Sequence, residues 1–583
     1  MELPSVVRSA LTKWSVFRIA LLLGAVLVLP RLGAVGLWDP WETHYAEVGR
    51  QMLARGDLVH PYWQNAWFFS KPPLVAWLSA LGLFVSGAQP WGSQGIGALP
   101  PGVEWFVRLP FALLFLFAGA TLAETVARRT TRRAGLLVAL VWWTMPLVDF
   151  LARQVMTDGP FVSCVVLSLC FASNAEVSKR ARDWALAFGF IGLAVLAKGL
   201  IGFLPAVIVL ISWAVLEGRG IVARAREVPM WAALLSVAIP APWFIAMARF
   251  QGVDDEGRTF VDRFFRYDHL ERLTTGVHTT TPGGSFTYFI EQGAFAIFPW
   301  VLVLPLALHV FFTHQRTGPT WRLALTWAVA LGLTFTLFTV SATRFHHYVM
   351  PMLPPLAVLM GLAMDALWDD VRAAMPAVVT GVVLFVVTAK DLVLRPRHWL
   401  DLFTYNHDRP YPNELVTQPL VVGAPSWLTL GGALTLASGV VVLALLLAVS
   451  KSSGERAVRV VGLFATGVAV FLSWVHWPQL GRHWTQRELV ERYYAERAPS
   501  EPLVAFFMNW KGETFYSRNE VTQVSARDPR ADVSLIISSH PRSWFLVEQH
   551  RVELLRSVLP PGARLVTVDA EQTNKFVLAR VER

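Results

Sequence analysis

Acidic, basic and histidine side chains gather in five short stretches, each of which adjoins a long apolar segment. The stretches are "GLWDPWETHYAEVGRQML" (36–53), "YWQNAWFFSKPPL" (62–74), "RQVMTDGPF" (153–161), "RFFRYDHLERLTTGVH" (263–278) and "SATRFHHYVMP" (341–351). Cations and histidines in a partly dry site offer a phosphate positive charge and hydrogen-bond donors. The candidates are Lys71, His269, Arg272, Arg344, His346 and His347. Carboxylates offer a hydroxyl nucleophile a general base. The combination predicts a transfer reaction on a phosphate-linked lipid at a membrane face.

Two further charged residues, Asp158 and Lys198, border or interrupt apolar runs. Asp158 precedes "GPFVSCVVLSLC", and Lys198 stands inside "IGLAVLAKGLIGF". A cation at the centre of a bilayer costs about 2.5–3.5 kcal/mol on insertion scales, so a buried Lys198 needs a partner or a water-filled cavity. Snorkelling to the interface explains Lys198 equally well from the sequence, because both flanking segments are short.

The composition is that of a polytopic membrane protein. Of the 583 residues, 54% are hydrophobic and only 16% are charged, and the apolar residues fall in long blocks. The formal net charge of +10 comes from basic residues in short connectors, which indicates lipid headgroups as partners and not nucleic acid. Cys164 and Cys170 share one apolar block at a spacing that fits neither a CxxC pair nor a zinc site, so we expect them to pack within a helix.

Thirteen apolar segments are predicted to span the membrane. The first follows Arg8, Lys13 and Arg18 and is not followed by a small-residue cleavage site, so it is interpreted as a retained anchor. The predicted spans are 17–36, 106–127, 134–150, 158–175, 184–199, 200–216, 230–248, 286–312, 323–340, 348–366, 375–392, 426–450 and 459–476.

Charge in the connectors predicts the orientation of these spans. If the N-terminus is cytoplasmic, the inner connectors are 128–133, 178–183, 217–227, 314–322, 369–372 and 451–459, and each of them carries Lys or Arg. Counting "KPPLVAWLSALGLFV" (71–85) as a span would move "RRTTRR" (128–133) outside, so we expect 71–85 to lie in the interface as an amphipathic helix. Segments 184–199 and 200–216 form either two spans or a broken pair.

The predicted fold class is an all-α polytopic membrane protein of about 13 transmembrane helices with a small α/β C-terminal domain. The transmembrane domain covers 1–476, with a large first outer loop at 37–105, and the soluble domain covers 477–583. In this tail we expect strands at 503–508, 533–538, 543–549, 564–568 and 575–581, and a helix at 550–558. An odd number of spans places the tail outside the cytoplasm.

The motifs resemble a known family when they are taken in order. "GLWDPWETHYAEVGRQMLARGD", "FFSKPPLVAWLSALG", "VRLPFALL" and "ARQVMTDGPF", followed by "SATRFHHYVMPMLPPLAVLMG" (341–361), are similar to motifs of bacterial family 39 membrane glycosyltransferases of the C-type superfold. That family includes the lipid A aminoarabinose transferases and is related to the protein O-mannosyltransferases. The resemblance implies an enzyme of the bacterial inner membrane that moves a sugar from a polyprenyl-phosphate carrier to a lipid, glycan or protein acceptor at the periplasmic face. Membrane lipids would be further partners.

The resemblance also implies roles for individual residues. Lys71 and Arg272 would bind the carrier phosphate, Tyr348 falls at another phosphate-contacting position, and Asp158 is the acid of the second loop. Arg344 takes the place of a lysine in the last motif. The predicted catalytic acids are Glu42, Asp39 and Asp158, and the predicted substrate-binding set is His44, Tyr45, Lys71, Arg153, Lys198, His269, Arg272, Arg344, His346, His347 and Tyr348.

The first motif departs from the family pattern at its principal acid. Family members commonly carry an Asp-Glu pair followed by Arg-Tyr, whereas this chain has Trp41-Glu42 followed by His44-Tyr45. Glu42 is preferred over Asp39 as the base by a narrow margin. Ser70 replaces the acid that often precedes "KPP" and that would bind a metal together with a histidine near His269. A divalent metal is therefore left open as a cofactor, and no metal-ligand spacing such as HExxH occurs.

Two alternatives to a glycosyltransferase remain at this stage. A transporter or lipid flippase would also carry intramembrane charges along a pathway, although no inverted repeat is evident and the polar groups are confined to one face. With Trp41 in the acid position, a non-catalytic binding or assembly protein of the same fold is the third interpretation.

Overall fold

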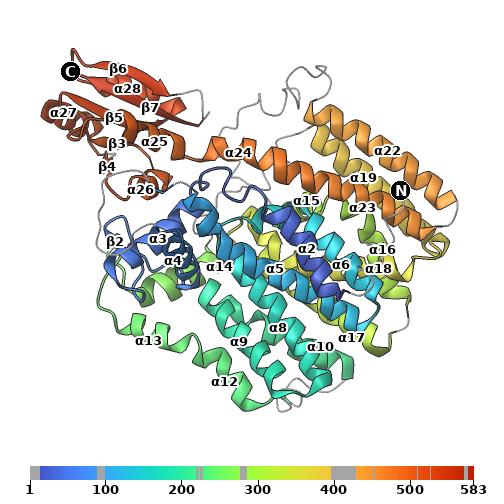
Figure 1. Cartoon of the computed structure of the whole chain (residues 1–583). Helices are drawn as coiled ribbons and strands as arrows, with labels where there is room; N and C mark the ends of the chain where they lie inside the picture. The colour runs from blue at the N-terminus through green and yellow to red at the C-terminus, as the bar shows by residue number, and fades with distance from the viewer. Residues whose placement is uncertain are drawn as a thin grey trace.

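The protein is a long helical bundle with a small sheet at one end (Figure 1). The computed structural model describes residues 14–87, 99–100, 102–217, 222, 228–275, 285–314, 316–394, 429–450, 453–508, 510–524, 527–569 and 575–583. The bundle packs around a large apolar core that includes Trp142, Trp143 and Trp300, all with less than 2% of their surface exposed. The sheet of the C-terminal residues lies beyond α24, at the far end from the helix pair α19 and α22 (Figure 1).

The helices of the bundle follow one another with short connections. They are α2 (Val16–Val28), α3 (Trp41–Arg55), α4 (Leu74–Val85), α5 (Val103–Arg129), α6 (Arg132–Thr144), α7 (Pro146–Leu151), α8 (Asp158–Ser178), α9 (Ala181–Lys198), α10 (Leu204–Glu217), α12 (Met230–Ala238), α13 (Ala241–Arg249), α14 (Arg272–Thr274), α15 (Ser285–Ala296), α16 (Leu304–Thr313), α17 (Gly318–Val340), α18 (Leu353–Ala366), α19 (Met375–Leu394), α22 (Leu430–Ser450), α23 (Gly454–Phe471) and α24 (Trp477–Trp484). Short 3-10 segments occur at Leu200–Phe203, Trp300–Val303, His346–Met352 and Arg372–Ala374, and π-helical segments occur at Asp262–Glu271 and Leu472–His476.

The membrane-protein class predicted from composition is confirmed. Within the described residues, eight helices are long and apolar enough to cross a membrane, and Phe286–Ala296 with Trp300–Thr313, bent by 110°, forms one further candidate crossing. Shorter apolar helices occur at Val16–Val28, Leu74–Val85 and Leu200–Leu216. The count of thirteen spans stays a prediction, and residues 426–428 of the twelfth span lie outside the described part of the chain.

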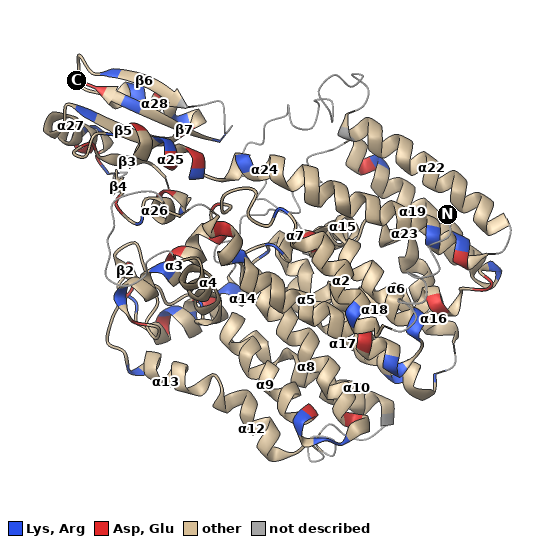
Figure 2. Ribbon diagram, viewed as in Figure 1, with Lys and Arg blue, Asp and Glu red and all other residues tan. Residues whose placement is uncertain are grey.

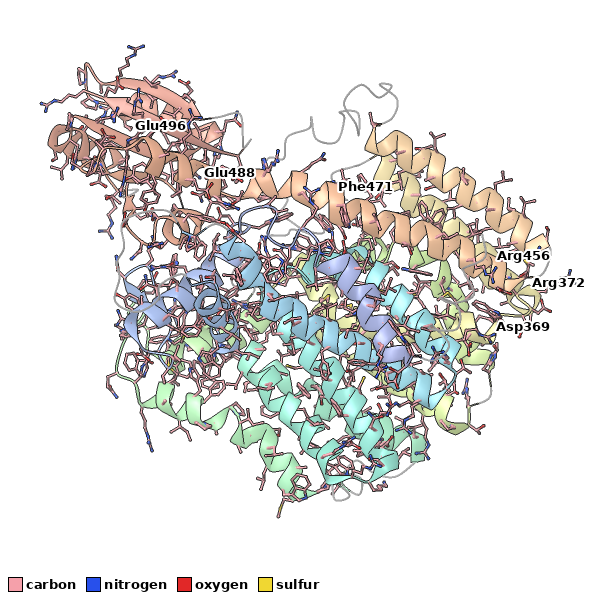
Figure 3. The ribbon with its side chains drawn as sticks, in the orientation of Figure 1. Asp369, Arg372, Arg456, Phe471, Glu488 and Glu496 are labelled. Atoms are coloured by element: carbon pink, nitrogen blue, oxygen red, sulfur yellow. The ribbon has the colours of Figure 1, made fainter. Side chains whose placement is uncertain are left out.

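Charged residues concentrate at the helix ends. Figure 2 shows the middle stretches of α5, α8 and α22 nearly free of lysine, arginine, aspartate and glutamate. Asp369, Arg372 and Arg456 lie together at the end of the bundle that is remote from the sheet, whereas Glu488 and Glu496 lie beside the sheet (Figure 3). Two of the connectors predicted to be inner, 369–372 and 451–459, therefore share one end of the molecule.

The first outer loop folds as a helix, a hairpin and a second helix. The helix predicted at "ETHYAEVGRQML" is α3, which ends at Gly56 with a φ of 66°, a conformation that glycine adopts at little cost. Strands β1 (Tyr62–Trp63) and β2 (Ala66–Trp67) pair antiparallel, and α4 starts directly after the double proline that follows Lys71. Helix α4 packs on α3 and α5, while Leu81, Phe84 and Val85 remain about half exposed.

The C-terminal residues form a mixed five-stranded sheet in the order β4-β3-β5-β7-β6. Its strands are β3 (Leu503–Phe506), β4 (Thr522–Gln523), β5 (Arg542–Glu548), β6 (Arg564–Asp569) and β7 (Phe576–Glu582), and its helices are α25 (Arg487–Glu496), α26 (Gly512–Tyr516), α27 (Pro529–Ser539) and α28 (Val552–Val558). Side chains alternate between the two faces of a strand. Phe545 and Val547 belong to a core with residues of α27 and α28, whereas Trp544 and Leu546 join the main core of the bundle. The sheet is therefore packed on both faces.

One strand prediction in this tail is wrong. Residues 533–538 ("VSLIIS") lie within helix α27 and not in a strand. The Asp528 side chain accepts a hydrogen bond from the Ala531 backbone at the N-terminus of this helix, and Pro529 is its first residue, which are both strong helix-start signals. Val533 and Ile537, spaced by four residues, face the core, so packing of one helical face outweighs the β propensity of the run.

Candidate active site

Five charged side chains from four segments meet near the end of the bundle that faces the sheet. Lys71 precedes α4, Asp158 begins α8, Lys198 ends α9, and Asp268 and Arg272 lie at the end of the π-helical segment. Lys71 interacts electrostatically with the other four charges of this group. We call these five residues the charge cluster. It holds three cations and two carboxylates, so it has a net charge of +1 that suits an anion.

Asp158 and Lys198 form an ion pair across two helix ends. The Lys198 ammonium lies 2.6 Å from Asp158 Oδ1, and Asp158 is fully buried. A carboxylate at a helix N-terminus and an ammonium at a helix C-terminus are each favoured by the helix dipole. The Lys198 ammonium also lies 4.9 Å from the centre of the Tyr348 ring. Lys198 is therefore paired inside the protein and does not snorkel to the interface.

A π-helical segment positions the second carboxylate. Arg272 Nη2 donates to Asp268 Oδ1 at 2.6 Å, and Arg263 Nε lies 3.4 Å from Asp268 Oδ2. π-Helical turns are rare and recur at functional sites. Here the segment lets Phe264 enter an aromatic cluster with Phe260 while Asp268 faces the charge cluster. Burial raises the pKa of Asp268, but Lys71, Arg272 and Arg263 outweigh burial and hold this pKa below its usual value.

His269 braces the turn that follows Lys198. Its Nδ1 lies 2.7 Å from the Phe264 carbonyl oxygen and donates to it, and its Nε2 accepts from the Leu200 backbone at 3.4 Å. A Cβ at Gly199, where φ is 82°, would lie 2.6 Å from the same Nε2. Both ring nitrogens of His269 are thus engaged with protein groups, and the ring fixes the backbone from which Lys198 projects.

Lys71 is the least solvated cation of the site. Burial, followed by the neighbouring Arg272, lowers the pKa of Lys71 to about 7. The Lys71 ammonium donates to the Ser70 carbonyl at 3.1 Å. A phosphate beside this side chain would restore its full charge, because a nearby anion favours the ammonium form.

Three aromatic side chains surround the charge cluster. Tyr348 lies below Lys198, and Tyr45 on α3 interacts electrostatically with Asp158 and Arg272. Burial and Asp158 raise the pKa of Tyr45, so its hydroxyl remains neutral and can donate a hydrogen bond. Trp41, the residue that replaces the expected aspartate, sets its ring 6.0 Å from His347 and 6.2 Å from Phe345. His347 Nε2 lies 3.8 Å from Asp158 Oδ2.

The Glu42 carboxylate has all its acceptor positions occupied by protein. Arg108 donates to both of its oxygens, at 2.9 and 2.6 Å, and the backbones of Trp38 and Val155 donate at 2.9 and 3.0 Å. Arg108 also donates to the carbonyls of residues 32, 35 and 36. This pair ties the first outer loop to α5 and to the second loop. It leaves Glu42 no free lone pair with which to take a proton from a substrate.

Other predicted site residues lie away from the charge cluster. Asp39 accepts from Thr43 at 2.6 Å and from Gln486 at 2.8 Å, which links the first loop to the C-terminal segment. Arg153 donates to the carbonyls of Leu27 and Val28 at the end of α2. His346 is buried against His347, with 5.1 Å between ring centres. Arg344 is half-buried, and its Nε has no hydrogen-bond partner in the described residues.

Arg108 and Lys511 belong to this region, although the sequence reasoning did not single them out. Arg108 carried a signal, since a charge within an apolar helix requires a partner. Lys511 carried none, because it lies far along the chain in a polar tail. The described residues contain no group of three or more His, Cys, Asp or Glu that could hold a metal ion. Ser70, at the position of the expected metal ligand, lies 3.3 Å from Arg263.

Comparison with solved structures places this architecture. ArnT from Cupriavidus metallidurans bound to undecaprenyl phosphate superposes with a TM-score of 0.68 at 19% identity, over 99% of this chain and 98% of that one. The chain has the ArnT fold. The same enzyme in its apo state gives a TM-score of 0.65. The expected C-type architecture is therefore confirmed at the level of the fold.

Sequence comparison gives the same relatives as the ArnT fold. The model of the dolichyl-phosphate-mannose-protein mannosyltransferase family matches residues 70–245. An undecaprenyl phosphate-α-4-amino-4-deoxy-L-arabinose arabinosyl transferase from Pseudomonas aeruginosa is 30% identical over 60% of this chain. A second one, from Pseudomonas fluorescens, is 27% identical over 63% of it. The chain spans 59% and 58% of the lengths of these relatives. The resemblance to family 39 glycosyltransferases is confirmed.

Proposed function

We propose that this protein is a membrane glycosyltransferase that takes a sugar from a polyprenyl-phosphate carrier. The observation that carries the proposal is the buried charge cluster, which offers three cations to one anion at a helix-bundle end. The ArnT fold supports it, because the solved ArnT binds undecaprenyl phosphate. The acceptor is a lipid, glycan or protein, and membrane lipids surround the donor tail.

Lys71 and Arg272 hold the donor phosphate, with Tyr348 as a further donor. As the bond between the sugar C1 and the phosphate oxygen breaks, its electron pair moves onto the phosphate, and negative charge accumulates there. Cations fixed in a site of low dielectric stabilise that charge without reorganising. Lys198 contributes to the same potential while its pairing with Asp158 at 2.6 Å holds it in place.

Asp158 is the carboxylate that we place at the reacting sugar. Glu42 is held by Arg108 and two backbone N–H groups, and Asp39 is held by Thr43 and Gln486. Asp158 faces the charge cluster, but its ion pair with Lys198 makes it a weak base. This arrangement fits an acceptor that is already ionised, such as a phosphate group. A phosphomonoester oxygen attacks C1 and becomes a diester, the donor diester becomes a monoester, and no proton has to move.

We also propose the topology that follows from the charges of the connectors. The chain crosses a bacterial inner membrane thirteen times, with its N-terminus in the cytoplasm and residues 477–583 forming a periplasmic α/β domain. Arg372 and Arg456 at the remote end of the bundle, and the sheet with Glu488 and Glu496 at the other end (Figure 3), support this orientation under the positive-inside rule.

Transfer of radiolabelled sugar from lipid carriers to acceptors in reconstituted vesicles tests the function. Mass spectrometry of glycolipids and glycans from a deletion strain first identifies the donor and the acceptor. Lys71→Ala should abolish transfer, while Arg556→Ala, which removes an exposed cation of α28, should leave it unchanged. Full turnover by Lys71→Ala would refute the assignment. Labelled lipid that changes leaflet without losing its sugar would indicate a flippase.

A further inference from the structure

The C-terminal segment reaches into the first outer loop at Lys511. Its ammonium lies 3.9 Å from the centre of the Trp63 ring, on the β1–β2 hairpin. A second contact joins the same two parts, since Asn519 Nδ2 donates to Asn65 Oδ1 at 3.2 Å. The C-terminal segment therefore meets the hairpin at two points.

The backbone beside Lys511 is fixed by buried contacts. A Cβ at Gly512 would lie 2.5 Å from Asp39 Oδ2, so residue 512 is pressed against the first loop. Gln486 Nε2 donates to both Asp39 and Glu513 at 2.8 Å. Two buried carboxylates and one amide thus hold the turn from which Lys511 projects. A cation fixed in this way has lost its rotamer freedom before any ligand arrives.

His44 connects Lys511 with the charge cluster. Its ring centre lies 4.8 Å from that of Trp63 and 4.6 Å from that of Phe68, and its neighbour Tyr45 interacts with Asp158. Burial lowers the pKa of His44, and Lys511 and Lys71 lower it further, so one imidazole lies within electrostatic reach of both lysines. His44 Nδ1 and Trp63 Nε1 are buried polar atoms that have no hydrogen-bond partner in the described part of the chain.

Unsatisfied buried polar groups are uncommon, and each one requires a reason. Here two of them adjoin one fixed ammonium, and all lie next to the cations assigned to the donor. An ammonium, an indole N–H and an imidazole nitrogen suit the oxygens of a phosphate, for which lysine is a common partner. The faces of Trp63 and Phe68 offer an apolar surface to a sugar ring that carries such a phosphate.

We propose that Lys511, Trp63 and His44 bind a phosphate group of the acceptor, so that the C-terminal segment completes the active site. The proposal deepens the proposed function and rests on it. The acceptor phosphate lies on the Lys511 side of His44, and the donor phosphate lies on the Lys71 side. Burial, partly offset by Glu513, Asp39 and Asp255, lowers the pKa of Lys511 to about 8, and a bound phosphate would raise it again.

Binding to the full-length protein in nanodiscs tests this assignment. The probes are lipid A carrying both phosphates, the same lipid after dephosphorylation, and undecaprenyl phosphate. Lys511→Met keeps the aliphatic stem against Trp63 and removes the charge. It should weaken binding of phosphorylated lipid A by about ten- to a hundredfold, the range of one charge-assisted hydrogen bond, and leave undecaprenyl phosphate binding unchanged. Lys511→Arg should retain binding, and Arg556→Ala, a cation of the same segment remote from the hairpin, should change neither affinity.

Three outcomes would overturn the proposal. They are unchanged lipid A binding by Lys511→Met, equal binding of the dephosphorylated lipid, and loss of both ligands, which would indicate a purely structural lysine. Failure of the proposed function gives a different pattern, because Lys71→Ala would then bind undecaprenyl phosphate as well as the wild type does.

Discussion

The Glu42–Arg108 pair separates a structural carboxylate from a catalytic one. Glu42 is fully buried, the Arg108 side chain is 3% exposed, and the carboxylate accepts four hydrogen bonds. Glu42→Gln replaces two of the acceptor positions by an N–H₂ group that faces existing donors. Disruption of a buried ion pair costs about 3–5 kcal/mol. We therefore expect a lower free energy of unfolding, with kcat per folded molecule within about tenfold of the wild type, whereas loss of a general base costs about 10²–10⁴-fold.

Thermal unfolding in detergent and single-turnover transfer on the same preparation measure the two effects separately. Arg108→Met, which strands the buried carboxylate, should destabilise the protein at least as much as Glu42→Gln. The double variant Glu42→Gln/Arg108→Met should recover part of the loss, because replacing both partners removes the unpaired charge. A Glu42→Gln protein that unfolds like the wild type but transfers sugar a thousandfold more slowly would refute this reasoning and restore Glu42 as the base.

Three further predictions concern the charge cluster. Since Lys71 has a pKa of about 7 in the free protein, its charged fraction falls as the pH rises from 7 to 9; kcat/KM for the phosphodiester donor, whose charge stays constant, should fall by up to tenfold per pH unit in the wild type and stay flat in Lys71→Arg. Asp158→Asn should lower transfer by at least a hundredfold, and Lys198→Met should weaken undecaprenyl phosphate binding, because each removes one half of the 2.6 Å pair; unchanged rate and affinity would contradict the roles assigned above. Gly199→Ala should lower donor affinity and thermal stability together, because its φ of 82° and its approach to His269 leave no room for a Cβ; a variant with wild-type melting and affinity would show that this turn does not position Lys198.

The comparison between sequence and structure differs by kind of residue. Lys71, Asp158, Lys198, Arg272 and Tyr348 were predicted from charges at the ends of apolar runs, and the structure brings them together. Such charges are costly in a bilayer unless they meet partners, so their presence alone indicates a shared site. The helix at 41–55 was equally evident from its motif.

The roles of the acids depended on tertiary contacts. Glu42 and Asp39 stand three residues apart in one polar stretch, and nothing in that spacing tells which of them is neutralised by a partner. Arg108, 66 residues later, occupies Glu42, and Gln486, 447 residues later, occupies Asp39. Residues 533–538 show the same limit for secondary structure, because a β-rich hexapeptide became helical where one face could be buried.

The sequence by itself thus determined the membrane class, the family resemblance and the set of polar residues at one face, because the cost of placing charge in hydrocarbon is a local property of each segment. Only the tertiary structure decided which carboxylate remains available for chemistry and that Lys511 adjoins the first loop. Hydrogen-bond saturation and electrostatic proximity are properties of pairs, and the partners here lie tens to hundreds of residues apart in the chain.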